Sequence, residues 1–229
     1  MDIHKPKPVH NWHELLSEIG VIIVGVLIAL GAEQTVEWLH WQGEVKETRE
    51  SLHAELGANL GVYKFRYDQL ACINRRIDEL ERWGQGWKSG RPVTPLLPVS
   101  RPRRQDLEFD AWEVAQSGGV AVRIPLTERI RVAAIYGKIR TFGVYQDDDV
   151  AVWRELQDFD GASRLDRRDL MRLHGLLNRT RTLNAAFEMN YLIAAKAADA
   201  LGIKAIPVKE FNLDKKAQFC GQFLPSASP

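Results

Sequence analysis

The side chains that could carry chemistry are few in this sequence, and they are scattered along it. His10 and His13 lie three residues apart beside Glu14, and residues 147–149 are three consecutive aspartates. A metal site needs ligands that converge on a rigid frame, and the proline-containing start of the chain predicts no such frame. Three adjacent carboxylates cannot all face one point on a helix, so we expect residues 147–149 to be solvated or to cap a helix. We therefore predict no metal site.

Catalytic signatures are also missing from the sequence. It contains no G-x-S-x-G, H-E-x-x-H or C-x-x-C motif and no Walker lysine loop. His40, His53 and His174 fall on separate predicted helices without an obvious cysteine or serine partner. We accordingly predict no catalytic residue and no cofactor site, and we expect that the protein is not an enzyme.

The two cysteines leave two interpretations open. Cys72 and Cys220 are compatible with one disulfide formed in an oxidising compartment. A pair of free or buried thiols fits the sequence equally well. A bridge would fasten the C-terminal tail to the first long helix.

One apolar stretch determines how the chain is organised. Residues 19–32 are 14 consecutive uncharged residues, which cover ~21 Å as a helix, less than the ~30 Å of a bilayer core. Apolar residues extend the pattern on both sides, and Trp12 and Trp38 lie ~39 Å apart on such a helix. That separation is close to a bilayer with its headgroups, where tryptophan is enriched. The pattern predicts one membrane span over residues 15–39.

Two other interpretations of this stretch remain. A cleaved signal peptide would have a short apolar core and small residues at its exit, here Ala29-Leu30-Gly31. A buried helix of a soluble protein would also be short and apolar. The acidic residues Asp2, Glu14 and Glu18 near the N-terminus are unusual for a signal peptide, so we favour an uncleaved anchor preceded by a cytoplasmic tail, residues 1–14.

The predicted span has one face of small residues with an acid at each end. At 100° per residue, that face falls within an arc of ~100°, opposite the bulky Leu27. Small residues allow helix backbones to approach closely, and a partner helix can supply donors for the acids. The predicted helix–helix contact face consists of Glu18, Gly25, Ala29, Ala32 and Glu33. Its partner would be another membrane protein or a second copy of this chain.

Beyond the span, apolar residues recur at steps of three and four, which is typical of amphipathic helices. The first such stripe predicts a nearly continuous helix from the span to about Trp83, ended by Gly84 and Gly86. Four prolines then predict a linker loop over residues 88–105.

Three further elements follow, according to the same pattern. We expect a short helix over residues 107–117, an extended turn over residues 120–124, and a long helix from Pro125 toward residue 156. Ser163-x-x-Asp166 resembles a capping box and predicts a last helix that runs to about Leu201. The predicted fold class is therefore all-α, with a single N-terminal transmembrane helix that continues into an extramembrane antiparallel helical bundle, residues 40–229.

Charge limits the partners and the orientation. The chain has 31 Lys and Arg against 30 Asp and Glu, for a net charge of +1, and it lacks the basic stripe expected of a nucleic-acid-binding protein. An N-terminal tail without a signal peptide normally stays inside. We expect a single-pass protein of a bacterial inner membrane with its N-terminus in the cytoplasm and its C-terminal domain in the periplasm.

The N-terminal segment resembles a family of uncharacterised bacterial single-span membrane proteins. The matching residues are Glu18-Ile19 and the run Gly25-Val26-Leu27-Ile28-Ala29-Leu30. In that family a Gln and an Asn-Asn-Trp stretch follow, whereas here residues 31–34 and later Trp38 take their place. The resemblance covers roughly the first 40 residues and implies a bitopic protein with an exported helical domain and no known active site.

Three hypotheses for function follow. The first is an interaction module, either an accessory or scaffold subunit of a membrane complex or a self-associating protein. The second is a periplasmic helical sensor that binds a ligand and acts through a partner. An enzyme of unrecognised type, which would use acids from facing helices, is the third.

Overall fold

The structure, a computed structural model, describes residues 12–88, 94–162, 164–208 and 220. All the regular elements in these ranges are helical, which confirms the predicted all-α class. In chain order they are α1 (Trp12–Asp68), α2 (Leu70–Lys88), α3 (Asp110–Ser117), the 3₁₀ helix η1 (Ala121–Arg123), α4 (Leu126–Gln157) and α5 (Arg167–Asp199).

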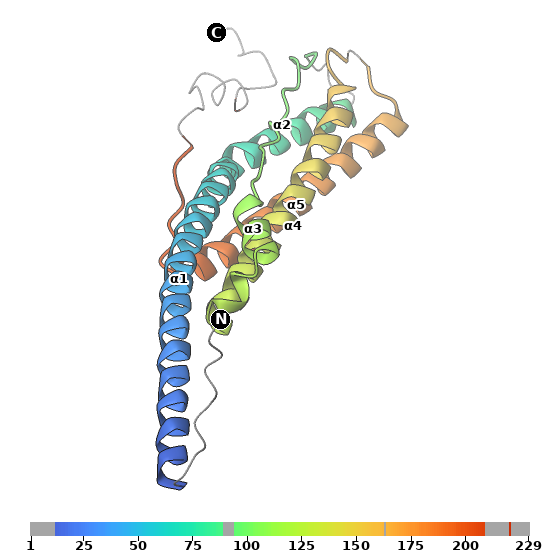
Figure 1. The fold of residues 1–229 in the computed structure, drawn as a ribbon. Helices are drawn as coiled ribbons and strands as arrows, with labels where there is room; N and C mark the ends of the chain where they lie inside the picture. The colour runs from blue at the N-terminus through green and yellow to red at the C-terminus, as the bar shows by residue number, and fades with distance from the viewer. Residues whose placement is uncertain (1–11, 89–93, 163, 209–219, 221–229) are drawn as a thin grey trace, which may run out of the picture.

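The longest element, α1, has two parts with different surroundings. Its N-terminal part projects alone as a stem, and its C-terminal part enters the bundle (Figure 1). The helix includes Trp12 and His13, which we had expected in the tail, and residues 1–11 lie outside the described ranges. Gln69 alone separates α1 from α2, and its backbone N–H donates to the carbonyl of Arg66 at 3.2 Å. The expected near-continuous helix is therefore present, with one interruption.

The bundle is built around the antiparallel pair α4 and α5, which pack against each other along their length (Figure 1). The α2 helix lies against α5, and the bundle part of α1 contacts α3, α4 and α5. Buried side chains form two clusters. The one nearer the stem includes Leu52, Leu56 and Tyr136, and the one at the far end includes Ile77, Trp153 and Phe187.

The expected end of the second helix was wrong, because α2 continues to Lys88. A side chain at Gly84 would place its Cβ 2.9 Å from the Leu173 Cδ2 atom of α5. Gly84 thus permits close packing of α2 on α5 and does not end the helix. Sequence alone shows the glycine but not the neighbouring helix that requires it.

Two other local expectations were also wrong. Residues 121–123, expected to be extended, form η1, which closes through the N–H of Ile124 donating to the Ala121 carbonyl at 3.2 Å. The capping box of the last helix starts three residues later than expected. Asp166 is the N-cap, and it exchanges hydrogen bonds with Asp169 at 2.8 and 3.0 Å. Ser163, the expected cap, lies outside the described residues.

The linker packs onto the bundle, although it has no regular structure over residues 94–109. Leu96 and Val99 are buried, and the Trp83 indole N–H donates to the Thr94 carbonyl at 2.9 Å. The N–H of Val99 donates to Asp160 at 2.7 Å. These contacts close the end of the bundle farthest from the stem.

A short segment after α5 lies directly on α1, where two glycines leave room for it. The N–H of Ile206 donates to the Gly57 carbonyl at 2.8 Å. A Cβ at Gly61 would lie only 1.7 Å from the Ile206 oxygen. Backbone contact of this kind requires glycine at position 61.

Candidate functional site: the stem and its junction with the bundle

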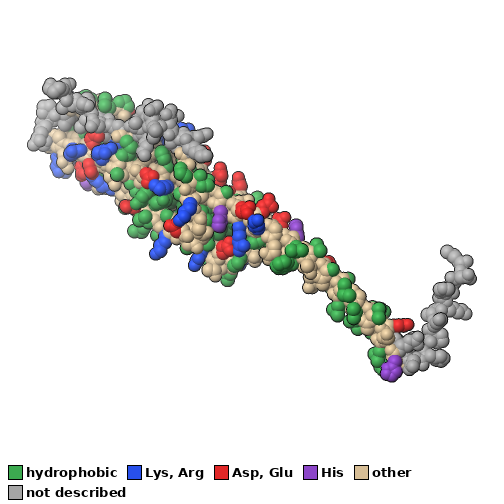
Figure 2. Space-filling model, turned by 90° about the vertical axis from the view of Figure 1, so that its left-hand side faces the viewer, with side chains coloured by type: hydrophobic (Ala, Val, Ile, Leu, Met, Phe, Trp, Pro, Cys, Tyr) green, Lys and Arg blue, Asp and Glu red, His purple; other side chains and the backbone are tan. Residues whose placement is uncertain are grey.

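The stem exposes the apolar stretch completely. None of the most apolar 18-residue window of α1 is buried, and by length and composition this helix could cross a membrane. Figure 2 shows the stem as a narrow rod that is almost free of charged side chains, whereas Lys, Arg, Asp and Glu cover the bundle. A buried helix of a soluble protein would be covered by the rest of the fold, so the structure argues against that interpretation.

The predicted helix–helix contact face lies entirely on the stem. Glu18, Gly25, Ala29, Ala32 and Glu33 are all exposed, and a Cβ at Gly25 would have no neighbour within 4 Å. The described part of the chain therefore leaves this face uncovered. Its residues share one side of one helix, which makes it available to a partner.

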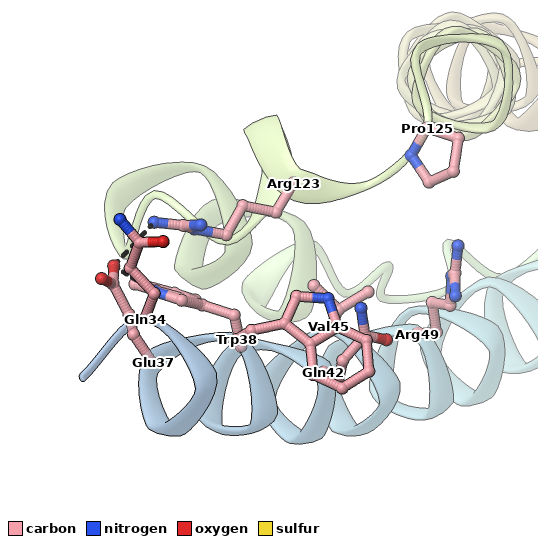
Figure 3. A pocket seen from close by; sticks show the side chains of 9 residues that line it. Gln34, Glu37, Trp38, Gln42, Val45, Arg49, Arg123 and Pro125 are labelled. Carbon is pink, nitrogen blue, oxygen red and sulfur yellow. Dashed lines mark hydrogen bonds and ion pairs between the residues drawn. The ribbon is translucent and has the colours of Figure 1, made fainter. Parts of the chain in front are cut away.

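A pocket of about 670 Å³ lies where the stem meets the bundle. We name it the junction pocket (Figure 3). Seven of its lining residues come from α1, one is the last residue of η1, and one precedes α4. The lining residues are Gln34, Glu37, Trp38, Trp41, Gln42, Val45, Arg49, Arg123 and Pro125.

Arg123 closes the stem side of the junction pocket. Its guanidinium lies 3.7 Å from the centre of the Trp41 ring and 3.8 Å from a Glu37 carboxylate oxygen. The Trp41 indole N–H donates to the same Glu37 oxygen at 3.2 Å. The three side chains form one cluster, which fixes η1 beside the last turns of the apolar part of α1; Figure 3 shows Arg123 reaching toward Glu37.

Arg49 closes the other side of the pocket through a two-pronged bond. Its Nε and Nη2 atoms donate to the two Glu128 oxygens at 2.8 and 2.7 Å. This hydrogen bond raises the pKa of Arg49 and holds the first turn of α4 against α1. Arg49 and Arg123 are therefore each paired with a carboxylate. The remaining side chains that line the pocket are aromatic, amide or apolar. Such a lining suits an amphiphile better than a reacting substrate.

The three consecutive aspartates match the expectation of solvated side chains only in part, because Asp149 is buried. Each one pairs with an arginine of a different segment: Asp147 with Arg104 at 2.7 Å, Asp148 with Arg179 at 3.2 Å, and Asp149 with Arg66 at 3.0 Å. None of them caps a helix, because all three lie inside α4. The first two are partly exposed, but the third is buried.

The buried aspartate belongs to a polar network inside the bundle. Arg66 donates to Asp149 and also to the Asn184 side-chain oxygen at 2.9 Å, and the Trp153 indole N–H donates to Asp149 at 3.1 Å. Burial raises the pKa of the Asp149 carboxyl, and the Arg66 charge opposes that rise. The network joins α1, α4 and α5 inside the bundle.

The structure joins Cys72 and Cys220 in a disulfide, with their Cα atoms 5.6 Å apart. The bond connects α2 to the end of the chain across 148 residues. Of the histidines named from the sequence, His13, His40 and His53 lie on α1 and His174 lies on α5, whereas His10 lies outside the described residues. Within the described ranges, no three His, Cys, Asp or Glu side chains gather as metal ligands.

A second pocket of about 630 Å³ lies at the far end, between α2 and the start of α5. Its lining includes Glu81, Lys88 and His174. Glu81 is already paired with Arg181, and a His174 ring nitrogen lies 3.0 Å from the Asn178 amide. Nothing in this lining pairs a nucleophile with a base.

Sequence reasoning missed the roles of two arginines: Arg66 inside the bundle and Arg123 at the junction pocket. Arg123 reaches the stem because the chain reverses at Gly119, which has a φ of +72°. The pair Gly118-Gly119 was the only local signal for that reversal. No protein-family model matches the chain, and no curated protein and no solved structure matches it either.

Proposed function

We propose that this chain is a single-span protein of a bacterial inner membrane that holds a helical interaction bundle in the periplasm. It would serve as an accessory or scaffold subunit of a membrane complex, or associate with itself. The observation that carries the proposal is the wholly exposed apolar stem of α1, which continues without a break into the bundle. The resemblance of residues 18–30 to bacterial single-span proteins supports it.

The disulfide supports the proposed orientation. Bonds of this kind persist in the bacterial periplasm and are rare in the cytoplasm. Cys72 and Cys220 both belong to the part of the chain beyond the stem. A bundle on the periplasmic side would therefore place residues 1–14 in the cytoplasm.

The uncovered small face of the stem supports the interaction role. Two carboxylates at the edges of a bilayer core are costly unless a partner or water satisfies them. Gly25 and Ala29 would let a second helix approach closely enough to do so.

A reporter that is active only in the periplasm, fused after Pro229, tests the orientation. We expect activity, and we expect that alkylation of unreduced protein from whole cells leaves Cys72 and Cys220 unlabelled. The same reporter fused to the chain without residues 1–40 should be inactive and is the control. An inactive full-length fusion with both thiols fully labelled would refute a periplasmic bundle. N-terminal sequencing that starts near Ala32 would instead identify a cleaved signal peptide.

Recovery of the intact protein in nanodiscs tests the interaction role. We expect the chain to be recovered with a stoichiometric partner or as an oligomer, as shown by mass spectrometry and light scattering. A monomer that carries a small metabolite would favour a sensor instead.

A further inference from the structure

Three apolar side chains lie exposed on the segment of the bundle that contacts the stem. Val122, Leu126 and Ile130 are 72%, 61% and 59% exposed. They follow one another at steps of four residues across η1 and the first turns of α4. We name these three residues the docking face.

The docking face has a fixed position relative to the stem. Arg123, next to Val122 in the chain, contacts Glu37 and Trp41. Arg129 donates to the Ala121 carbonyl at 3.4 Å and so ties η1 to α4. Val122 therefore lies level with residues 37–41, where the predicted span ends, whereas Glu128, between Leu126 and Ile130, bonds with Arg49 and places these two residues farther along α1. Figure 1 shows this end of α4 as the part of the bundle nearest the stem.

We propose that the docking face rests in the headgroup layer of the membrane that the stem crosses, so that the protein contacts the bilayer at two places. The inference rests on the proposed membrane anchor. What distinguishes these exposed apolar side chains from others on the bundle, such as Val144, is that they lie near the level where Trp38 and Trp41 mark a lipid interface. The junction pocket opens between the stem and the docking face and is lined by the same two indoles.

The charges at this level decide which lipid chemistry is required. Acidic and basic side chains are matched in number over residues 33–49 and 121–131. They are Glu33, Glu37, Glu44, Glu47 and Glu128 against Lys46, Arg49, Arg123, Arg129 and Arg131. A matched set gives no net attraction to anionic lipid. The contact is therefore apolar and aromatic, a zwitterionic bilayer suffices, and salt should not weaken it.

Fluorescence quenching in nanodiscs of phosphatidylcholine tests the docking face. An environment-sensitive dye is attached to a single added cysteine in the full chain, with the native disulfide left oxidised. Lipids with a nitroxide near the headgroup are the quencher for the probes on the bundle, and lipids with a nitroxide deep in the acyl chain are the quencher for the probe at residue 24. Probe sites are Val122→Cys and Leu126→Cys. Val144→Cys is the matched control, because it lies on the same helix, is also 61% exposed, and is ~27 Å farther along α4 than Leu126. Val24→Cys reports on the anchor itself.

We expect strong quenching at residues 24, 122 and 126 and little at residue 144, unchanged at high salt. Quenching at 24 without quenching at 122 and 126 would overturn the docking face and leave the anchor standing. Loss of quenching at 24 would remove the anchor, and the inference would fall with it. Quenching at 122 that requires anionic lipid and disappears in salt would show a basic lipid site and contradict the apolar contact.

A pair of charged substitutions tests the same face with the dye at its third residue, Ile130. Val122→Asp with Leu126→Asp should abolish quenching of a probe at Ile130→Cys, whereas Val144→Asp should leave it unchanged. Circular dichroism of each variant shows whether the bundle remains folded. Undiminished quenching in the folded double variant would overturn the proposal.

Discussion

At the scale of single residues, the buried side chain of Arg66 connects three of the long helices. Its guanidinium bonds with Asp149 of α4 and Asn184 of α5, and it lies 4.3 Å from the centre of the Phe187 ring. Burial lowers the pKa of Arg66, opposed by the charge of Asp149. A buried pair of this kind adds little net stability, but removing one partner leaves an uncompensated charge inside the protein.

Arg66→Met should therefore destabilise the bundle by about 3–5 kcal/mol, because it leaves Asp149 charged and buried. Thermal unfolding of the full chain in detergent, followed by circular dichroism, measures the loss. The double variant with Asp149→Asn should recover at least ~1 kcal/mol of it, since the pair is directly coupled. Purely additive losses would show that the two side chains do not act together.

This network explains why Asp149 was misjudged. From sequence, three adjacent aspartates predict a solvated or capping segment. Their partners lie 43, 31 and 83 residues away, on segments whose positions only the fold determines. The helical period could indicate which aspartate faces inward. It could not show that the side chain of Arg66 lies beside that aspartate in the interior of the bundle.

At the scale of elements, periodicity predicted the helices well, because a repeat of three and four residues is a local property. The element ends were less accurate where tertiary packing decides them. Gly84 was interpreted as a helix stop, but it lies where α2 packs closely against α5. Gly57 and Gly61 were not noticed, and they form the surface of α1 on which residues 203–206 lie.

Gly61→Ala tests that contact. The added methyl would overlap the Ile206 oxygen, so the segment must move away, and we expect a loss of about 1–3 kcal/mol. Gly137→Ala is the matched control: Gly137 is also inside a helix, but nothing lies within 4 Å of an added Cβ. That control should gain about 0.5–1 kcal/mol from helix propensity. Equal effects of the two changes on chemical denaturation would show that residues 203–206 do not need Gly61.

At the scale of the whole molecule, the small face of the stem should decide association. Gly25→Leu with Ala29→Leu should block close approach of a second helix and weaken association by about 1–2 kcal/mol. Leu27→Ala on the opposite side should have little effect and is the control. Cross-linking in membranes or a membrane two-hybrid assay measures the difference. If the double variant associates as well as the parent, the face is only a matter of composition, and the two acids must reach water by themselves.

Because α1 is one continuous helix, it connects the predicted membrane span rigidly to the bundle, and a tilt of the span would move the bundle. From residue 39 to residue 68 the helix extends ~44 Å, with no described break before Gln69. A thinner bilayer tilts a span that is too long for it, and each 10° of tilt would swing the far end of this arm by roughly 8 Å. The start of α2, which the disulfide fastens directly after the end of this arm, would therefore travel much farther than the anchor that drives it.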